Sequence, residues 1–172
     1  MNAHEFMASL AQGTPPQIYL LAGEEPYYIR RAEEAILRRL LPDVAARADA
    51  LIRYEEMPSI DALAESLETA PFFTDKIVVL VHDAAVFRAG KKATECDAPV
   101  PKDGAAERLL ALLTNLLPTT YVVFTLNAKP DKRRKLYQAV QKAGRILESE
   151  AMRPWNVEGW RNERLREMGR SM

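Results

Sequence analysis

Short apolar runs alternate along this chain with longer segments in which apolar residues recur every three or four positions. Runs of the first kind are typical of buried strands, and segments of the second kind are typical of amphipathic helices. The alternation predicts the α/β fold class, with a parallel sheet that carries helices on both faces. We expect five strands, at Ile18–Ala22, Ala50–Tyr54, Lys76–His82, Thr120–Leu126 and Arg145–Leu147.

Four helices are expected between these strands. They cover Pro26–Leu41, a segment capped by Ser59, a leucine-rich segment from Asp103 or Gly104 to Pro118, and Lys132–Ala143. The leucine-rich segment has a wide apolar face, made of Leu109, Leu110, Leu112, Leu113, Leu116 and Leu117. Gly144 is expected at the C′ position of the last helix. Residues 84–103 show neither period, which predicts a mobile loop.

The length of 172 residues suits one domain of ordinary size, and 48% apolar residues support a hydrophobic core. We expect this domain to cover residues 1–151. A helical tail, the start of a further domain, is expected at residues 152–172.

Composition excludes several function classes. The 24 basic and 24 acidic side chains cancel, so the net charge draws the protein neither to nucleic acid nor to a membrane. Cys96 is the only cysteine, which excludes an internal disulfide and fits a reducing compartment. Only two histidines, His4 and His82, accompany it, so we expect no metal site. With no run long enough to cross a bilayer, we expect a soluble, cytoplasmic protein.

Between the first strand and the first helix, Gly23, Glu24 and Glu25 stand where a nucleotide-binding protein has its phosphate loop. A working loop needs several glycines, a lysine and a following Ser or Thr. By Coulomb's law, a carboxylate about 5 Å from a phosphate costs roughly 3 kcal/mol at an effective dielectric near 20. The sequence offers no lysine to oppose these two carboxylates. We therefore interpret this segment as a degenerate phosphate loop and expect no nucleotide cofactor.

Two adjacent aromatic residues, Phe72 and Phe73, follow Pro71 in the turn before the third strand. One interpretation is that they close the hydrophobic core, as large aromatic side chains commonly do. The other is that they are an exposed anchor for a partner protein. Buried in a partner's pocket, each ring would contribute on the order of 1.5–3 kcal/mol.

A basic cluster follows the fourth strand at the carboxyl end of the sheet. Its members are Lys129, Lys132, Arg133, Arg134 and Lys135, with Asp131 the one acid among them. Such a run is either a solvated start of a helix or a patch that contacts phosphates or an acidic partner. The sequence leaves both interpretations open.

Three of these segments occur in an order that resembles the bacterial DNA polymerase III delta subunit family. They are the strand–Gly-Glu-Glu-Pro–helix start, the segment from Ala70 to Val79 with its Pro-Phe-Phe-Thr-Asp-Lys core, and the basic cluster. The resemblance covers roughly Ile18 to Ala151 and matches only the first of the family's three domains. It implies a P-loop NTPase or AAA+ (RecA-like) core that lacks a functional Walker A loop.

The resemblance also implies a function. Family members are non-catalytic subunits of the clamp loader within the DNA polymerase III holoenzyme, a nucleotidyltransferase complex active in DNA replication. An apolar pair after the second helix enters a cleft on the sliding clamp, the beta subunit, and opens it. The matching positions are Phe72 and Phe73, where the family often has an aliphatic residue followed by Phe. Other loader subunits and primed DNA are the further implied partners.

Two alternatives to this interpretation remain open. The first is a divergent nucleotide-dependent enzyme at the carboxyl edge of the sheet, where Glu24, Glu25 and His82 would carry the chemistry. The second is a nucleic-acid-binding domain that uses Lys132 to Lys135, whose affinity would fall steeply with salt.

Overall fold

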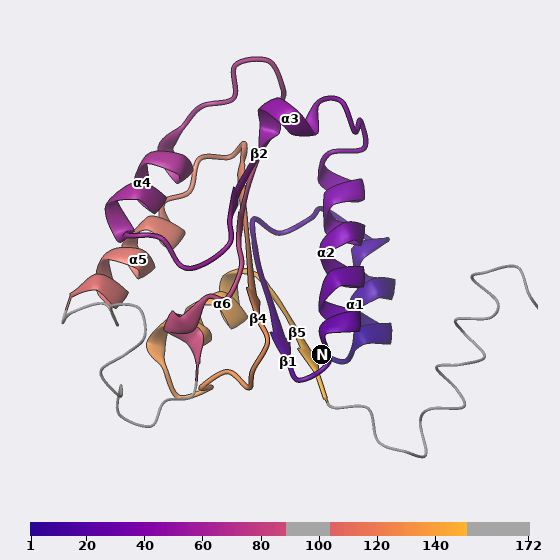
Figure 1. Ribbon diagram of the computed structural model, residues 1–172, viewed down its shortest axis with the longest axis vertical. Coiled ribbons are helices and arrows are strands. Elements are labelled where there is room, and N and C mark those ends of the chain that lie inside the picture. Colours follow the sequence, from indigo (N-terminus) through magenta and orange to yellow (C-terminus); the bar gives the residue numbers. More distant parts are fainter. Residues whose placement is uncertain (89–103, 151–172) are drawn as a thin grey trace, which may run out of the picture.

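A computed structural model of the chain describes residues 1–88 and 104–150. The expected helical tail, and most of the expected loop at 84–103, lie outside these residues. Five parallel strands form one sheet in the order β2-β3-β4-β1-β5 (Figure 1). They are β1 (Ile18–Gly23), β2 (Leu51–Tyr54), β3 (Ile77–Val81), β4 (Thr120–Leu126) and β5 (Arg145–Ser149). The predicted strands and the predicted fold class are confirmed, with bounds that differ by at most two residues.

Helices cover both faces of the sheet (Figure 1). One face carries α1 (Ala3–Leu10) and α2 (Pro26–Leu40), and the other carries α4 (Ile60–Glu68), α5 (Ala105–Thr114) and α6 (Lys135–Ala143). A single turn, α3 (Arg47–Ala50), leads into β2, and a 3₁₀ turn, η1 (Ala85–Phe87), follows β3. In the described part of the chain, no helix is both long enough and apolar enough to span a membrane.

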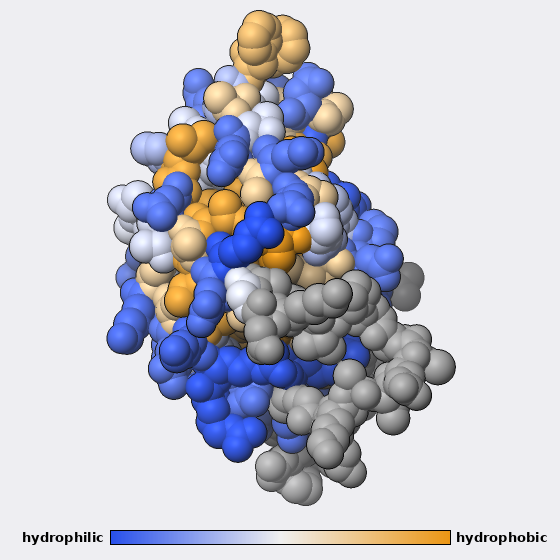
Figure 2. Space-filling view, turned by 90° about the vertical axis from the view of Figure 1, so that its left-hand side faces the viewer, coloured by the Kyte–Doolittle hydropathy of each residue, from blue (hydrophilic) through white to orange (hydrophobic). Residues whose placement is uncertain are grey.

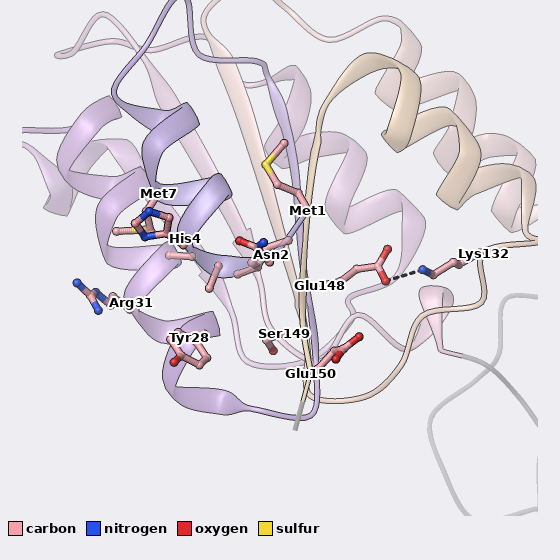
Figure 3. A pocket seen from close by; sticks show the side chains of 13 residues that line it. Met1, Asn2, His4, Met7, Tyr28, Arg31, Lys132, Glu148, Ser149 and Glu150 are labelled. Carbon is pink, nitrogen blue, oxygen red and sulfur yellow. Dashed lines mark ion pairs between the residues drawn. The ribbon is translucent and has the colours of Figure 1, made fainter. Parts of the chain in front are cut away.

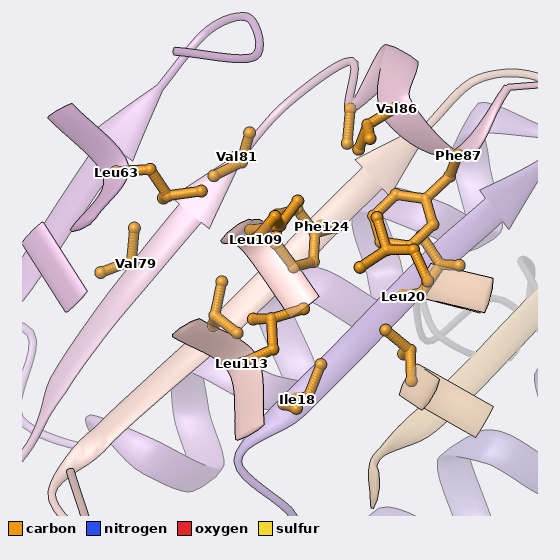
Figure 4. Packing of buried hydrophobic residues seen from close by; sticks show 14 of the residues in the cluster. Ile18, Leu20, Leu63, Val79, Val81, Val86, Phe87, Leu109, Leu113 and Phe124 are labelled. Carbon is orange, nitrogen blue, oxygen red and sulfur yellow. The ribbon is translucent and has the colours of Figure 1, made fainter. Parts of the chain in front are cut away.

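The core divides into two clusters because successive side chains of a strand point to opposite faces of the sheet. Leu20, Val79 and Phe124 pack beneath α4, α5 and α6 (Figure 4). Their neighbours Tyr19 and Leu21 pack on the other face, against α1 and α2. Strands buried on both faces explain the nearly continuous apolar runs in the sequence.

The first helix was not predicted from the sequence. Asn2 and Glu5 form a capping box in which each side chain accepts a hydrogen bond from the other residue's backbone N–H, at 2.9 and 3.2 Å. Phe6 and Leu10, four residues apart, are buried. The capping-box residues and this spacing of apolar residues are the sequence signal that would have predicted α1.

Two predicted helix bounds were wrong. The leucine-rich helix ends at Thr114 rather than at Pro118, so Leu117 leaves the apolar face. The last helix begins at Lys135 rather than at Lys132, because Asp131 forms a turn in which its carboxylate accepts from the Arg133 backbone N–H at 3.1 Å. The predicted N-cap at Ser59 and the predicted start of a helix at Pro26 are confirmed.

Two further expectations are corrected at the ends of these elements. Gly144 is extended, with φ −134° and ψ −154°, and is not a left-handed C′ residue. A Cβ at this position would overlap the backbone carbonyl of Ile18, and this close approach is the reason for glycine. In the expected loop, Val86 and Phe87 belong to η1 and are buried in the core.

Candidate functional site

The parallel sheet places the candidate residues at two opposite edges. The connections that enter the strands lie at one edge, here called the amino edge, and the connections that leave the strands lie at the other, the carboxyl edge. The α4–β3 connection, with Phe72 and Phe73, is at the amino edge (Figure 1). The degenerate phosphate loop and the basic cluster are at the carboxyl edge. These two groups of candidate residues are therefore separate sites.

Phe72 and Phe73, here called the Phe pair, are both exposed to solvent. Their exposed fractions are 90% and 80%. The rings meet edge to face, with centroids 5.0 Å apart and an interplanar angle of 72°. Figure 2 shows apolar side chains projecting from the end of the molecule at which this connection lies. The interpretation in which the Phe pair closes the core is therefore wrong.

The local structure explains why neither ring turns inward. On one side, α4 ends at Glu68, and the Thr69 hydroxyl donates to the Glu65 carbonyl at 2.6 Å. On the other side, the Thr74 hydroxyl donates to the Lys76 carbonyl at 2.8 Å, just before β3 enters the sheet. The connection is thus fixed at both ends, and the Phe pair lies on the outside of the bend between them.

At the carboxyl edge, the degenerate phosphate loop is bonded to β5. The Glu24 backbone N–H donates to the Ser149 carbonyl at 2.9 Å, and the Ser149 hydroxyl donates to the Glu25 carbonyl at 3.3 Å. Gly23 has φ +147°, and a Cβ there would overlap the Ser149 backbone. The single glycine of the loop is therefore required by the contact between β1 and β5.

The two glutamates also have structural partners. Glu25 is the N-cap of α2, and its carboxylate accepts from the Tyr27 backbone N–H at 3.3 Å. A helix N-terminus at this place could hold a phosphate, but here it is occupied by the protein's own carboxylate. The Nζ of Lys129 lies 3.3 Å from the Glu24 carboxylate. The expectation that no lysine opposes the two glutamates was wrong for Glu24, since Lys129 reaches it from the β4–α6 connection.

Most members of the basic cluster pair with acids. Lys132 contacts Glu148 at 2.6 Å (Figure 3). Arg133 and Arg134 both contact Asp131, at 3.1 and 3.9 Å, and Arg134 also donates to the Val86 carbonyl at 2.8 Å. Lys135 is exposed at the start of α6. Because Lys129 also pairs with Glu24, four of the five cations have an acidic partner. This pairing favours a structural role for the cluster over a role in binding phosphate.

Glu148 connects this cluster to the sheet. Partial burial raises the pKa of its carboxyl, but hydrogen bonds from Lys132 and Tyr137 outweigh that effect and the pKa is lowered. The Tyr137 hydroxyl donates to Glu148 at 2.6 Å, and burial together with this hydrogen bond raises the pKa of Tyr137. In the ion pair of Arg133 with Asp131, hydrogen bonds from Arg133 lower the pKa of the Asp131 carboxyl.

The residues of the enzymatic alternative are not assembled into one site. His82 lies between Glu33 of α2, 3.1 Å from its Nε2, and Glu55 after β2, 3.2 Å from its Nδ1. Glu24 and Glu25 are engaged by Lys129 and by the α2 N-terminus instead. In the described ranges, no group of three or more His, Cys, Asp or Glu residues has a geometry that could hold a metal.

Two exposed apolar residues at the amino edge were missed from the sequence. Val44, in the connection between α2 and α3, is 72% exposed, and Leu117, before β4, is 37% exposed. The sequence signal for Val44 is its position after Pro42 and Asp43, outside any apolar period. Leu117 stands directly before Pro118, where a helix has to end.

Comparison with known families gives one match over most of the chain. Residues 19–150 match the family described as DNA polymerase III, delta subunit. In a sequence comparison with curated proteins, no significant match was found.

Two solved structures share the fold. The DNA clamp loader delta protein of Bacillus subtilis superposes with a TM-score of 0.76 at 20% identity, over 96% of this chain and 48% of that protein. A DNA polymerase III gamma subunit-related protein from Thermotoga maritima superposes with a TM-score of 0.52 at 14% identity, over 99% of this chain and 55% of that protein. The chain thus spans about half the length of each. Both superpositions agree with the α/β fold of a parallel sheet that carries helices on both faces.

Proposed function

The chain belongs to the DNA polymerase III delta subunit family, and we propose that it is a non-catalytic clamp-loader domain that binds the sliding clamp through the Phe pair. The observation that carries the proposal is the exposure of two adjacent phenylalanine rings, at 90% and 80%, on a connection fixed at both ends. Two solvated rings do not stabilise the isolated domain. Their burial in an apolar cleft of a partner would stabilise the complex.

The mechanism we propose is differential binding. The Phe pair enters a cleft beside one interface of the clamp and fits the opened form better than the closed ring. The domain then shifts the clamp toward the opened form by the difference between its two affinities, and by no more than that difference. The edge-to-face contact between the rings, at 5.0 Å, supports this role because side chains already held in place lose less entropy on binding.

In this proposal the domain does not hydrolyse ATP, which is the task of other subunits of the loader. The Glu25 carboxylate at the α2 N-terminus supports this assignment. Contacts with the other loader subunits and with primed DNA are part of the proposed role. The pairing of Lys129, Lys132, Arg133 and Arg134 with acids favours the clamp over DNA as the direct partner of this domain.

The test is the affinity of the chain for the purified sliding clamp of the same organism. Replacing both Phe72 and Phe73 with alanine is expected to weaken binding by at least about 2 kcal/mol, roughly thirtyfold. Because both rings are exposed, the thermal unfolding midpoint is expected to stay unchanged. A matched control is Asn127→Ala, an exposed residue after β4 at the carboxyl edge, which should bind as the wild type does. Unchanged affinity in the folded double variant would refute the proposal.

A further inference from the structure

We propose that Val44 and Leu117 join the Phe pair in one apolar contact surface along the amino edge, and that a single protein partner contacts all four side chains. This inference rests on the proposed function, since the occupant is the same clamp. It adds two residues, from two other connections, to the surface that the clamp recognises.

The distribution of exposed apolar residues carries the inference. In residues 1–88 and 104–150, the large apolar side chains that are exposed are Met1, Val44, Phe72, Phe73 and Leu117. All of these except Met1 lie in the connections that precede β2, β3 and β4. Those three strands are direct neighbours in the sheet. Isolated exposed apolar residues are ordinary on a protein surface, but a set gathered in three adjacent connections is typical of an interaction site.

The three connections emerge side by side because their strands begin level with one another. Leu51 pairs with Val78, and Ile77 pairs with Thr120, in the registers of the two strand pairs. Neighbouring strands are about 4.8 Å apart, so β2 and β4 enter the sheet within roughly 10 Å of each other. The Ile77 backbone N–H also donates to the Thr119 carbonyl at 2.9 Å, which ties the Phe pair's connection to that of Leu117.

The two flanking residues are held in place by hydrogen bonds of their own. The Leu117 carbonyl accepts from the Gln17 side chain at 2.6 Å and from the Thr120 backbone N–H at 3.0 Å. The Val44 carbonyl accepts from the Arg47 backbone N–H at 3.3 Å. A surface fixed in this way requires little ordering when a partner binds.

Charge near this surface defines the chemistry of the partner. Asp43, Glu68 and Asp75 are exposed in or beside the connections that carry Val44 and the Phe pair. An apolar centre with an acidic rim fits a cleft that is apolar inside and bordered by cations. The contacted region of the clamp is therefore expected to carry lysine or arginine around an apolar cleft.

The experiment measures clamp affinity for single variants in which the Phe pair is kept. Val44→Ala and Leu117→Ala are each expected to weaken binding about threefold to tenfold, because each removes apolar atoms from the contact. Val44→Leu is expected to tighten binding, since it adds apolar area without touching the core. Asn127→Ala at the carboxyl edge is the control. Thermal unfolding accompanies each titration, because Leu117 is partly packed.

The outcomes separate this inference from the proposed function. If the Phe72→Ala, Phe73→Ala variant loses affinity while Val44→Ala and Val44→Leu both bind as the wild type does, the extended surface is refuted and the Phe pair stands. Reduced affinity in Val44→Ala and Leu117→Ala, with unchanged affinity in the Phe variant, would refute the anchor, and with it a surface on which the partner contacts all four side chains. A wild-type chain that does not bind the clamp refutes both.

Discussion

Three glycines allow the contact between β1 and β5 to be tested by a matched set of substitutions. Gly23 ends β1 at the carboxyl edge, and Gly144 precedes β5 at the amino edge. A Cβ at Gly23 would overlap the Ser149 backbone, and a Cβ at Gly144 would overlap the Ile18 carbonyl. Gly13 has φ +68° with open space around it, so it isolates the cost of the backbone conformation.

The expected costs follow from these differences. Gly13→Ala places a side chain at positive φ alone, which costs about 1–2 kcal/mol. Gly144→Ala keeps an ordinary φ and forces only a steric displacement, worth about 1–3 kcal/mol. Gly23→Ala combines positive φ with overlap of a backbone carbonyl, so we expect the two costs together, about 2–5 kcal/mol. That is a large share of the free energy of unfolding of a typical domain, which is roughly 5–15 kcal/mol.

Urea unfolding of the three variants, followed by circular dichroism, measures these free energies. The expected order of destabilisation is Gly23→Ala first, with the other two well behind. If Gly23→Ala and Gly13→Ala lower the free energy of unfolding equally, the loop after β1 accommodates the added Cβ without a further steric cost. In that case the account of why this loop has its single glycine would be refuted.

Two further predictions concern the carboxyl edge. At about pH 7, Glu148→Gln is expected to destabilise the fold by about 1 kcal/mol through the loss of the charged contact with Lys132. Since folding lowers the pKa of Glu148, this contribution is present at neutral pH and is lost as the pH falls through the folded pKa. Urea unfolding at a series of acidic pH values should therefore find a difference between variant and wild type that shrinks as the pH falls, and a difference that stays constant would contradict the assignment. Calorimetric titration with magnesium ATP is expected to give no micromolar binding, because the Glu25 carboxylate occupies the α2 N-terminus; micromolar binding would revive the enzymatic alternative.

The strands and the fold class could be predicted because burial on both faces leaves continuous apolar runs that few other structures share. The ends of helices were harder to predict, since local turns and their side-chain hydrogen bonds determine where a helix begins and ends. The Asp131 carboxylate accepts a hydrogen bond from the Arg133 backbone N–H, and α6 begins only after this turn. At the other helix, α5 ends at Thr114, and Leu117 is left exposed before Pro118. Neither effect changes the apolar period, so the pattern alone could not locate them.

The candidate site was predictable in part. The sequence identified Phe72 and Phe73 but could not decide between core and surface, because exposure depends on how the connection is fixed at Thr69 and Thr74. The pairing of Lys129 with Glu24 joins residues far apart in the chain. Such pairs follow from strand order, and the order β2-β3-β4-β1-β5 brings the ends of β4 and β1 together.

The measurement that tests the central claim most directly is a calorimetric titration of the sliding clamp with this chain at several temperatures, beside the Phe72→Ala, Phe73→Ala variant. Binding with a negative heat-capacity change that is lost in the variant is the predicted result, because burial of two exposed rings removes apolar surface from water. The same affinity and the same heat-capacity change for variant and wild type would contradict the claim that the Phe pair is the clamp-binding element.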